Sequence, residues 1–225
     1  MAVTGESDRS EKQMLERIVH WTLNGQAQPP FLCTPEALED LAAGFLLTAG
    51  RVKAFSQISG ISSSQDSLAV QLSGEPAPTQ YIDKRLSLTA PLESALRITV
   101  DTLRRCADRL TGEESFYGTH RIMLYGPRGE ITREDIGRHN AADKVIGEAA
   151  RLGWDLSSCA LGATGRVSLE ILAKAAMVGI PIIFSRKYPS DLTCAYALRL
   201  GIGIAAKIQS AQPELSGAVW RFMQG

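Results

Sequence analysis

Hydrophobic and polar residues alternate with the period of a β-strand in two parts of the N-terminal third of the chain. Residues 17 to 23 suit a strand, Asn24-Gly25 suits a tight turn, and residues 29 to 33 provide a returning strand. Further short strands are predicted between residues 58 and 88, for example at 67 to 72. This pattern predicts a hairpin followed by a small set of additional strands.

Two segments instead show the spacing of amphipathic helices. The first is predicted from about residue 35 to 49, with the hydroxyl of Thr34 as its N-cap and Pro35 in its first turn. The second is predicted from 94 to 110, and Cys106 lies beside its apolar face. The apolar positions are Leu38, Leu41, Ala42, Phe45 and Leu46 in the first helix and Leu96, Val100, Leu103, Ala107 and Leu110 in the second.

The C-terminal half alternates between strands and helices, and several of its apolar runs are continuous. Such runs are typical of strands buried on both faces of a sheet. Strands are predicted at 121–125, 130–134, 158–163, 179–184 and 202–208, and helices over a segment ending at 150, over 167–178 and over 191–200. This order predicts a three-layer α/β domain with a partly parallel sheet over residues 89–225. Residues 1–88 would form a small N-terminal α+β domain, with 1–12 disordered.

Composition limits the classes of function. Of 225 residues 44% are hydrophobic, and 24 basic residues balance 24 acidic ones, so no overall charge favours a nucleic acid or an anionic membrane. No apolar run approaches the roughly 20 residues that span a bilayer, and residues 1–13 are polar. We therefore expect a cytoplasmic protein that binds neither membrane nor nucleic acid.

The cysteines and the standard motifs exclude several chemistries. Cys33, Cys106, Cys159 and Cys194 are far apart, with no C-x-x-C pair and no zinc-ligand spacing, so we expect buried free thiols. The sequence also lacks the H-x-E and P-C-x-x-C motifs of zinc deaminases, the G-x-G-x-x-G motif and the Walker A motif. The sequence therefore predicts no metal site.

The densest group of polar residues opens the helix that ends at 150, in the run Glu134-Asp-Ile-Gly-Arg-His-Asn-Ala-Ala-Asp-Lys144. Free amides and the helix dipole make helix N-termini favourable for anions, and Arg138 and His139 would add positive charge. An ordinary capped helix with a solvated charged face explains the residue types equally well.

Two further turns are candidates for the same kind of site. In Thr164-Gly165-Arg166-Val167-Ser168, glycine allows close approach of a ligand and arginine can pair with phosphate. The loop Phe184-Ser185-Arg186-Lys187-Tyr188-Pro189-Ser190 follows a buried strand, where ligands of α/β proteins usually bind. A structural turn and a basic surface loop are the competing interpretations, and a lone histidine such as His120 is more often structural than catalytic.

The 134–144 motif is long and specific, and the segments 38–48, 118–120, 165–170 and 174–181 agree with it in order. Together they resemble the formate dehydrogenase accessory (FdhD-type sulfurtransferase) family over about residues 24–208. The resemblance implies a cytidine-deaminase-like α/β domain without zinc, joined to a small N-terminal domain. It also implies cofactor-binding residues Asp135, Gly137, Arg138, His139, Asn140, Lys144, His120, Gly165, Arg166, Ser168, Ser185 and Lys207.

The resemblance further implies a function. Members of this family take sulfur from a cysteine desulfurase and pass it to the molybdenum or tungsten bis(pyranopterin guanine dinucleotide) cofactor. The client is the catalytic subunit of formate dehydrogenase, and the family often forms homodimers.

This chain departs from the family at the relay itself. Where the family has a Cys-Gly-x-Cys-Gly loop, residues 88–93 read Leu-Thr-Ala-Pro-Leu-Glu, and the segment from Lys207 lacks the family's Arg-Gly. A persulfide needs a thiolate. We therefore expect a module that binds or chaperones the cofactor without a sulfur relay. Sulfur transfer through a substitute thiol, with Cys106 first, and a regulatory protein that binds a guanine nucleotide remain alternatives.

Overall fold

The N-terminal part is a four-stranded sheet with one helix packed against it. The computed structural model describes residues 15–111 and 118–223, so the expected disorder of residues 1–12 lies outside it. The strands are β1 (Arg17–Leu23), β2 (Gln26–Cys33), β3 (Ile58–Ser63) and β4 (Ser67–Leu72), in the order β2-β1-β4-β3. Helix α1 (Leu38–Thr48) and the 3-10 turn η1 (Phe55–Gln57) complete this part. The predicted hairpin and the short strands at 58–63 and 67–72 are confirmed, whereas residues 82–88, which were expected to belong to the strand region, form a helix.

A second, six-stranded sheet forms the centre of the larger part. Its strands are β5 (His120–Gly126), β6 (Gly129–Asp135), β7 (Ala160–Ala163), β8 (Ile182–Ser185), β9 (Gly203–Ala206) and β10 (Glu214–Gly217). They lie in the order β10-β9-β8-β7-β5-β6. Strands β7, β8 and β9 are parallel, whereas β5 is antiparallel to both β6 and β7. The sheet is therefore partly parallel, as predicted.

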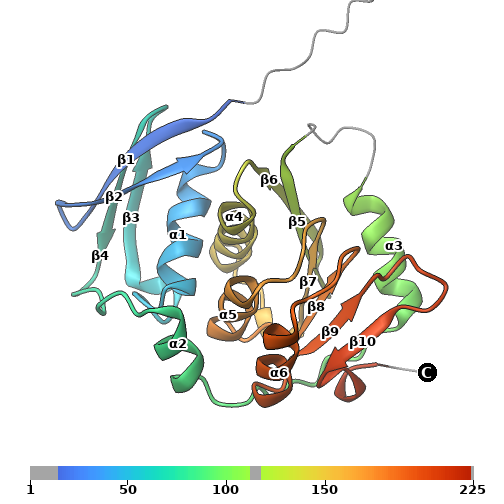
Figure 1. Ribbon diagram of the computed structural model, residues 1–225. Coiled ribbons are helices and arrows are strands. Elements are labelled where there is room, and N and C mark those ends of the chain that lie inside the picture. The colour runs from blue at the N-terminus through green and yellow to red at the C-terminus, as the bar shows by residue number, and fades with distance from the viewer. Residues whose placement is uncertain (1–14, 112–117, 224–225) are drawn as a thin grey trace, which may run out of the picture.

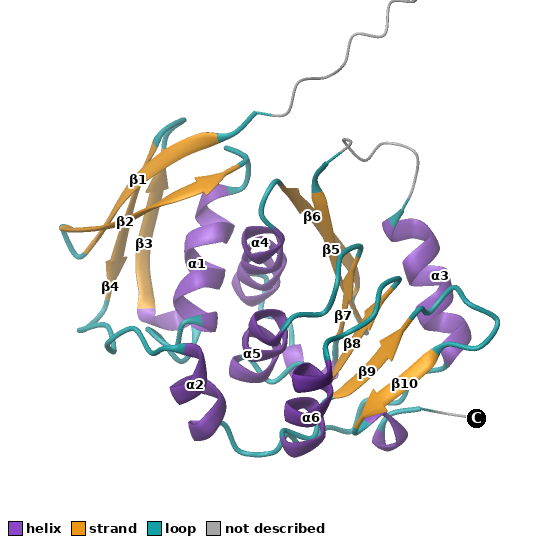
Figure 2. Ribbon diagram, viewed as in Figure 1, coloured by secondary structure: helices purple, strands orange, loops and turns teal. Residues whose placement is uncertain are grey.

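Helices cover both faces of this sheet (Figures 1 and 2). The helices are α2 (Ile82–Leu88), α3 (Val100–Leu110), α4 (Arg138–Arg151), α5 (Leu169–Met177) and α6 (Asp191–Arg199), with 3-10 turns η2 (Leu156–Ser158) and η3 (Val219–Arg221). One face packs against α4, α5 and α6, and the other packs against α3 and η3. The predicted three-layer α/β fold with a small N-terminal part is confirmed.

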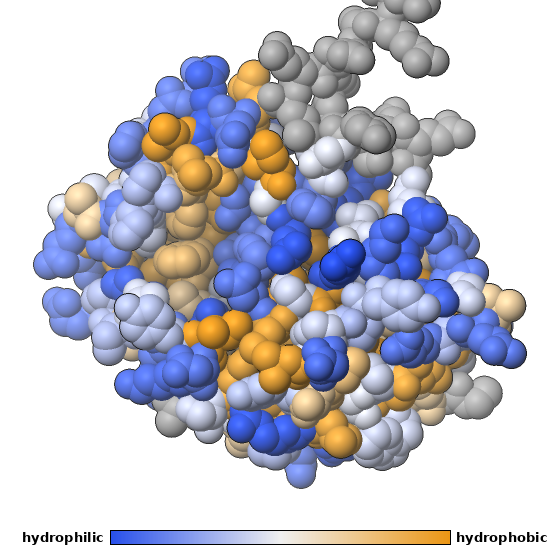
Figure 3. Space-filling model, viewed as in Figure 1, coloured by the Kyte–Doolittle hydropathy of each residue, from blue (hydrophilic) through white to orange (hydrophobic). Residues whose placement is uncertain are grey.

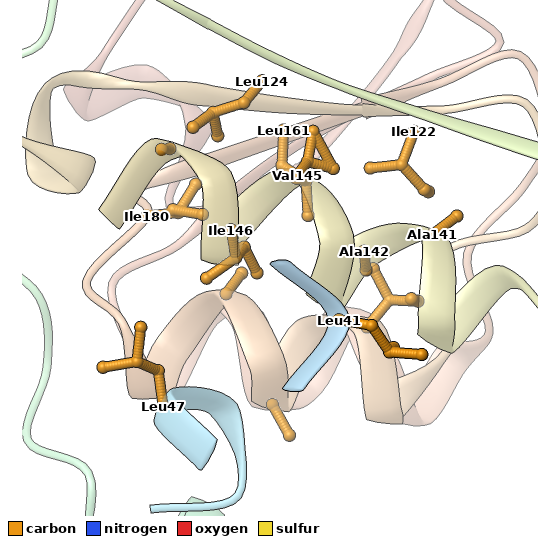
Figure 4. Close-up of a cluster of buried hydrophobic side chains, with 14 of the residues drawn as sticks. Leu41, Leu47, Ile122, Leu124, Ala141, Ala142, Val145, Ile146, Leu161 and Ile180 are labelled. Carbon is orange, nitrogen blue, oxygen red and sulfur yellow. The ribbon is translucent and has the colours of Figure 1, made fainter. Parts of the chain in front are cut away.

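The larger hydrophobic core runs without interruption from the N-terminal part into the larger part. Leu41 of α1 is buried beside Ala142 and Val145 of α4 in one cluster (Figure 4). The two helices approach closely, because a Cβ atom at Gly44 would overlap the backbone of Asp143 and one at Gly147 would overlap the backbone of Asp40. The two parts therefore share one hydrophobic core. The predicted domain boundary at residue 88 stays a prediction.

Helix α1 begins at Leu38, so the predicted start at Pro35 and the cap by Thr34 were wrong. Thr34 faces the other part of the molecule, where its amide donates to Asp135 Oδ2 at 3.1 Å and its hydroxyl accepts from the amide of Ile136 at 3.3 Å. Ala37, in the left-handed region at φ 51°, then turns the chain into the helix. A contact across about a hundred residues therefore outweighs the local capping signal.

Helix α3 also begins later than predicted, at Val100. The hydroxyl of Thr99 caps it by accepting from the amide of Thr102 at 3.1 Å. The chain before it is extended, and Ile98 pairs with Met223 in a parallel bridge.

Within the described ranges, no helix is both long and apolar enough to cross a membrane.

Candidate functional site

The topology brings five chain segments to one edge of the six-stranded sheet. Strands β7, β8 and β9 end there, since Ala163 pairs with Ser185 and Phe184 with Ala205. The antiparallel strand β5 begins there and β6 ends there, where His120 pairs with Asp135. We call this end of the sheet the basic edge and define it by the residues His120, Arg138, Arg166, Arg186, Lys187 and Lys207.

Cations outnumber carboxylates at the basic edge. Glu170 and Asp191 lie in the first turns of α5 and α6, and Asp135 is already paired. Arg166, Arg186 and Lys187 are exposed. In Figure 3 hydrophilic residues gather over the loops that follow β7 and β8, whereas hydrophobic residues gather over α5 and α6. This edge is therefore suited to an anionic ligand.

Ser185 holds the loops of the edge together. This residue is 1% exposed, and its hydroxyl donates to the carbonyl of Gly165 at 2.7 Å. Its own carbonyl accepts from the amide of Ile208 at 3.1 Å. Gly165 approaches His120 closely, since a Cβ atom at Gly165 would lie 3.2 Å from His120 Nδ1. The predicted residues Ser185, Gly165 and His120 therefore lie together, and Ser185 supports the edge from below.

Part of the 134–144 motif is occupied by internal contacts. Lys144 Nζ lies 2.6 Å from Asp135 Oδ2, and the same ammonium donates to the carbonyl of Thr34 at 2.9 Å. Asp135 Oδ1 accepts from the amide of Gly137 at 2.8 Å and from Asn140 Nδ2 at 3.1 Å. Asp135, Lys144 and Asn140 therefore fix the start of α4 to the N-terminal part, which leaves them little capacity to bind a ligand.

Arg138 and His139 form the part of the motif that faces outward from this network. The N-cap of α4 is Gly137, which offers no side-chain cap, and the first turn holds no acidic residue. Arg138 Nε is buried without a hydrogen-bond partner. Uncapped amides, the helix dipole and an unpaired guanidinium nitrogen together favour an anion at this position.

Both histidines near the edge favour the neutral form. Burial lowers the pKa of His139, and its Nε2 lies 2.6 Å from Glu170 Oε2 without hydrogen-bond geometry. Burial lowers the pKa of His120 as well, and the charge of Arg138 lowers it further. A phosphate group would oppose both effects, because a nearby negative charge favours protonated histidine.

Of the remaining predicted residues, Ser168 has a structural role and Lys207 contacts an exposed side chain. Ser168 is the N-cap of α5, where its hydroxyl accepts from the amide of Ile171 at 3.5 Å. Lys207 lies in the left-handed region at φ 46° and donates to the hydroxyl of Tyr188 at 2.6 Å. Tyr188 lies inside the candidate loop 184–190 that the sequence indicates, although only Ser185 of that loop was expected to contact the ligand.

Residues 88–93, which replace the family's cysteine loop, lie at the opposite edge of the sheet. The amide of Leu92 donates to the carbonyl of Leu200 at 2.8 Å, just before β9 begins. Thr89 Oγ1 lies 3.7 Å from the sulfur of Met177, at the end of α5. In Figure 1 this segment joins α2 to α3 along the bottom of the molecule. Residues 88–93 and the basic edge therefore lie at opposite ends of the strands, separated by the length of the sheet along them.

Three of the four cysteines lack the environment of a reactive thiol. Cys33, Cys106 and Cys159 are buried, and burial raises the pKa of each, to about 11 for Cys33 and about 12 for Cys159. Cys194 is only half-buried, so the expectation of a buried thiol was wrong for this residue, and its thiol lies 3.5 Å from Ser216 Oγ. Nucleophilic sulfur chemistry needs a thiolate, and the raised pKa values disfavour it.

Metal ligands are not grouped in the part of the chain that the structure describes. No cluster of three or more histidine, cysteine, aspartate or glutamate side chains there could hold a metal ion. The donors at the basic edge are guanidinium, ammonium and amide groups, which bind anions. Such groups can pair with an anion such as a phosphate group.

Comparisons with known proteins show the family of this chain. The model of the FdhD/NarQ family matches residues 14–90 and 78–215. A sulfur carrier protein FdhD from Listeria innocua is 30% identical over 207 residues, which cover 80% of this chain and 79% of the relative. One from Cupriavidus necator is 28% identical over 236 residues, covering 92% of this chain and 82% of the relative.

A solved structure has the same fold. The crystal structure of a protein assigned as a formate dehydrogenase accessory protein, from Desulfotalea psychrophila, superposes with a TM-score of 0.81 at 28% identity. The match covers 92% of this chain and 90% of that one. The chain described here therefore belongs to the FdhD/NarQ family.

Proposed function

We propose that this protein binds the guanine-dinucleotide form of the molybdenum or tungsten cofactor and protects it for a formate dehydrogenase, without relaying sulfur. The main support for this proposal is the basic edge. There Arg138 Nε is buried without a hydrogen-bond partner, beside the start of α4, which has no side-chain cap. Family membership supports a role in formate dehydrogenase maturation. The client would be the catalytic subunit of that enzyme, in the cytoplasm.

The size of the basic edge suits a long anionic ligand. Strands β6 and β9 are separated by four strand intervals in the sheet order. At roughly 4.8 Å per interval the edge extends for about 19 Å, with cations at both ends. A single phosphate would use only part of this length, whereas a ligand that carries phosphates and bases along one chain can contact all of it.

The proposed loss of sulfur transfer rests on the thiols. Residues 88–93 contain no sulfur atom, and Cys33, Cys106 and Cys159 are buried with raised pKa values. Cys106 is the substitute thiol that lies nearest in sequence to residues 88–93. Its side chain is 0% exposed and packs between α3 and the sheet, so a cysteine desulfurase could not reach it without local unfolding.

The test is calorimetric titration with guanosine diphosphate, a soluble part of the cofactor. We expect binding to the wild type and about ten-fold or more weaker binding to Arg138→Ala, because hydrogen bonds between charged groups contribute about 1.5–3 kcal/mol. Arg105→Ala is the matched control, since Arg105 is exposed on α3 and its guanidinium donates to the hydroxyl of Thr102 on the same helix. Absence of binding to the wild type at millimolar ligand would refute the proposal.

A further inference from the structure

Tyr188 is a half-exposed aromatic residue inside the basic edge. It lies in the loop between β8 and α6 and is 52% exposed. Its hydroxyl accepts a hydrogen bond from Lys207 Nζ at 2.6 Å, and the same ammonium lies 4.7 Å from the ring centroid. Because the hydroxyl contact is much the shorter, the lysine restrains the ring at its hydroxyl end and leaves about half of the side chain open to a ligand.

The loop that carries Tyr188 is fixed on both sides. Before it, the buried hydroxyl of Ser185 accepts from the amide of Lys187 at 3.0 Å. After it, Pro189 has a restricted backbone, and the hydroxyl of Ser190 caps α6 by accepting from the amide of Thr193 at 3.2 Å. The ring is therefore held in place before any ligand arrives, which lowers the entropic cost of a contact to it.

We propose that Tyr188 is the residue on which a nucleobase of the bound ligand stacks. The inference rests on the proposed function and adds a residue outside the phosphate contacts. Aromatic side chains in positively charged grooves stack bases, while nearby cations hold the phosphates. Here Arg138 and Arg166 lie at the ends of β6 and β7, and Tyr188 follows β8.

The positions along the sheet set the direction of the ligand. Strands β7 and β9 are two intervals apart in the sheet order, and Lys207, which follows β9, holds the ring of Tyr188. Two intervals correspond to about 10 Å. A nucleoside diphosphate with its phosphates at Arg138 and Arg166 therefore directs its base toward β8 and β9, where the aromatic ring lies.

Stacking has a recognisable signature, because every base has a π-face and the contact tolerates different bases. Loss of the ring should weaken the binding of guanosine diphosphate and adenosine diphosphate by similar factors and leave the binding of pyrophosphate unchanged. A tyrosine that only caps Lys207 at the surface would change none of these affinities, since exposed contacts of this kind contribute little.

The experiment compares three ligands on four forms of the full-length protein. Guanosine diphosphate, adenosine diphosphate and pyrophosphate are titrated into the wild type, Tyr188→Ala, Tyr188→Phe and Tyr81→Ala. Tyr81 is the matched control, because it is 84% exposed and lies at the start of α2, away from the basic edge. Circular dichroism confirms that each variant is folded.

We expect Tyr188→Ala to lower the affinity for both nucleotides about ten-fold or more and to leave the affinity for pyrophosphate unchanged. Tyr188→Phe keeps the ring and should bind close to wild type, as should Tyr81→Ala. Equal nucleotide affinities for Tyr188→Ala and the wild type would overturn this inference while the proposed function stands. If the wild type binds no nucleotide at all, both are overturned.

Discussion

Lys144 and Asp135 form an ion pair inside the protein, with Nζ and Oδ2 at 2.6 Å and side chains 1% and 0% exposed. The carboxylate accepts further hydrogen bonds from the amides of Thr34 and Gly137 and from Asn140 Nδ2. The pair thereby joins the turn before α1 to the start of α4. The junction therefore fixes the chain that leads into α4, whose first residue is Arg138.

Removing the ammonium should destabilise the fold strongly. We expect Lys144→Met to lower the free energy of unfolding by about 3–5 kcal/mol, because the carboxylate of Asp135 is left buried without its counter-charge. Urea denaturation measures the loss. Lys84→Met is the control, since Lys84 is exposed and should change stability by less than about 0.5 kcal/mol. A loss below about 1 kcal/mol for Lys144→Met would show that the pair is dispensable.

The close contact between α1 and α4 gives a second prediction. Gly44→Ala places a methyl group against the backbone of Asp143, which cannot move without separating the helices. Overpacking of this kind costs about 1–3 kcal/mol or more, so the thermal midpoint should fall by several degrees. Gly74→Ala is the matched control, because no atom lies within 4 Å of its added Cβ. Equal midpoints for the two variants would contradict the packing described here.

His120 should make stability depend on pH. Its pKa is lowered in the folded protein by burial and by the charge of Arg138, so the unfolded chain takes up a proton first as the pH falls. The stabilisation that comes from keeping His120 neutral is therefore complete above the unfolded pKa of about 6.5 and is lost below it.

The measurement for this effect is urea denaturation of the wild type and His120→Gln at pH 7.5 and pH 5.5. The wild type should lose more stability than the variant between these two values, because glutamine does not titrate. Identical losses in the two proteins would mean that His120 titrates with an unshifted pKa.

The thiols should react in two groups. Cys33, Cys106 and Cys159 are 0% exposed, and their raised pKa values keep them protonated at neutral pH. A thiol reagent should modify at most Cys194 in the native protein and the other three only after denaturant is added. Rapid modification of all four in native buffer would disprove this assignment.

The sequence predicted most strands and helices of the larger part because each of these has a strong local pattern. The run from residue 179 to 184 and the helix that starts at Arg138 are examples. It misplaced the start of α1, since the hydrogen bonds of Thr34 to residues 135 and 136 are invisible in a local window. Strand β10 was missed because it is only four residues long and shows no local strand pattern. Its pairing with β9 appears only in the folded structure.

The candidate site was predicted in part. Strand order and direction, which a sequence does not display, decide that His120, Arg138, Arg166 and Lys207 share one edge. The sequence also could not separate the buried members of the motif from the outward ones. Asp135 and Lys144 neutralise each other in the interior, whereas Arg138 next to them has an unpaired nitrogen.

The most direct test of the account is sulfur loading by a cysteine desulfurase. The protein is incubated with the desulfurase, cysteine and labelled sulfur, beside the sulfur carrier protein FdhD of Listeria innocua as the positive control. Single Cys→Ala variants at residues 33, 106, 159 and 194 are run in parallel. The account predicts no stoichiometric persulfide on this protein, whereas stoichiometric loading that one of these variants abolishes would contradict it.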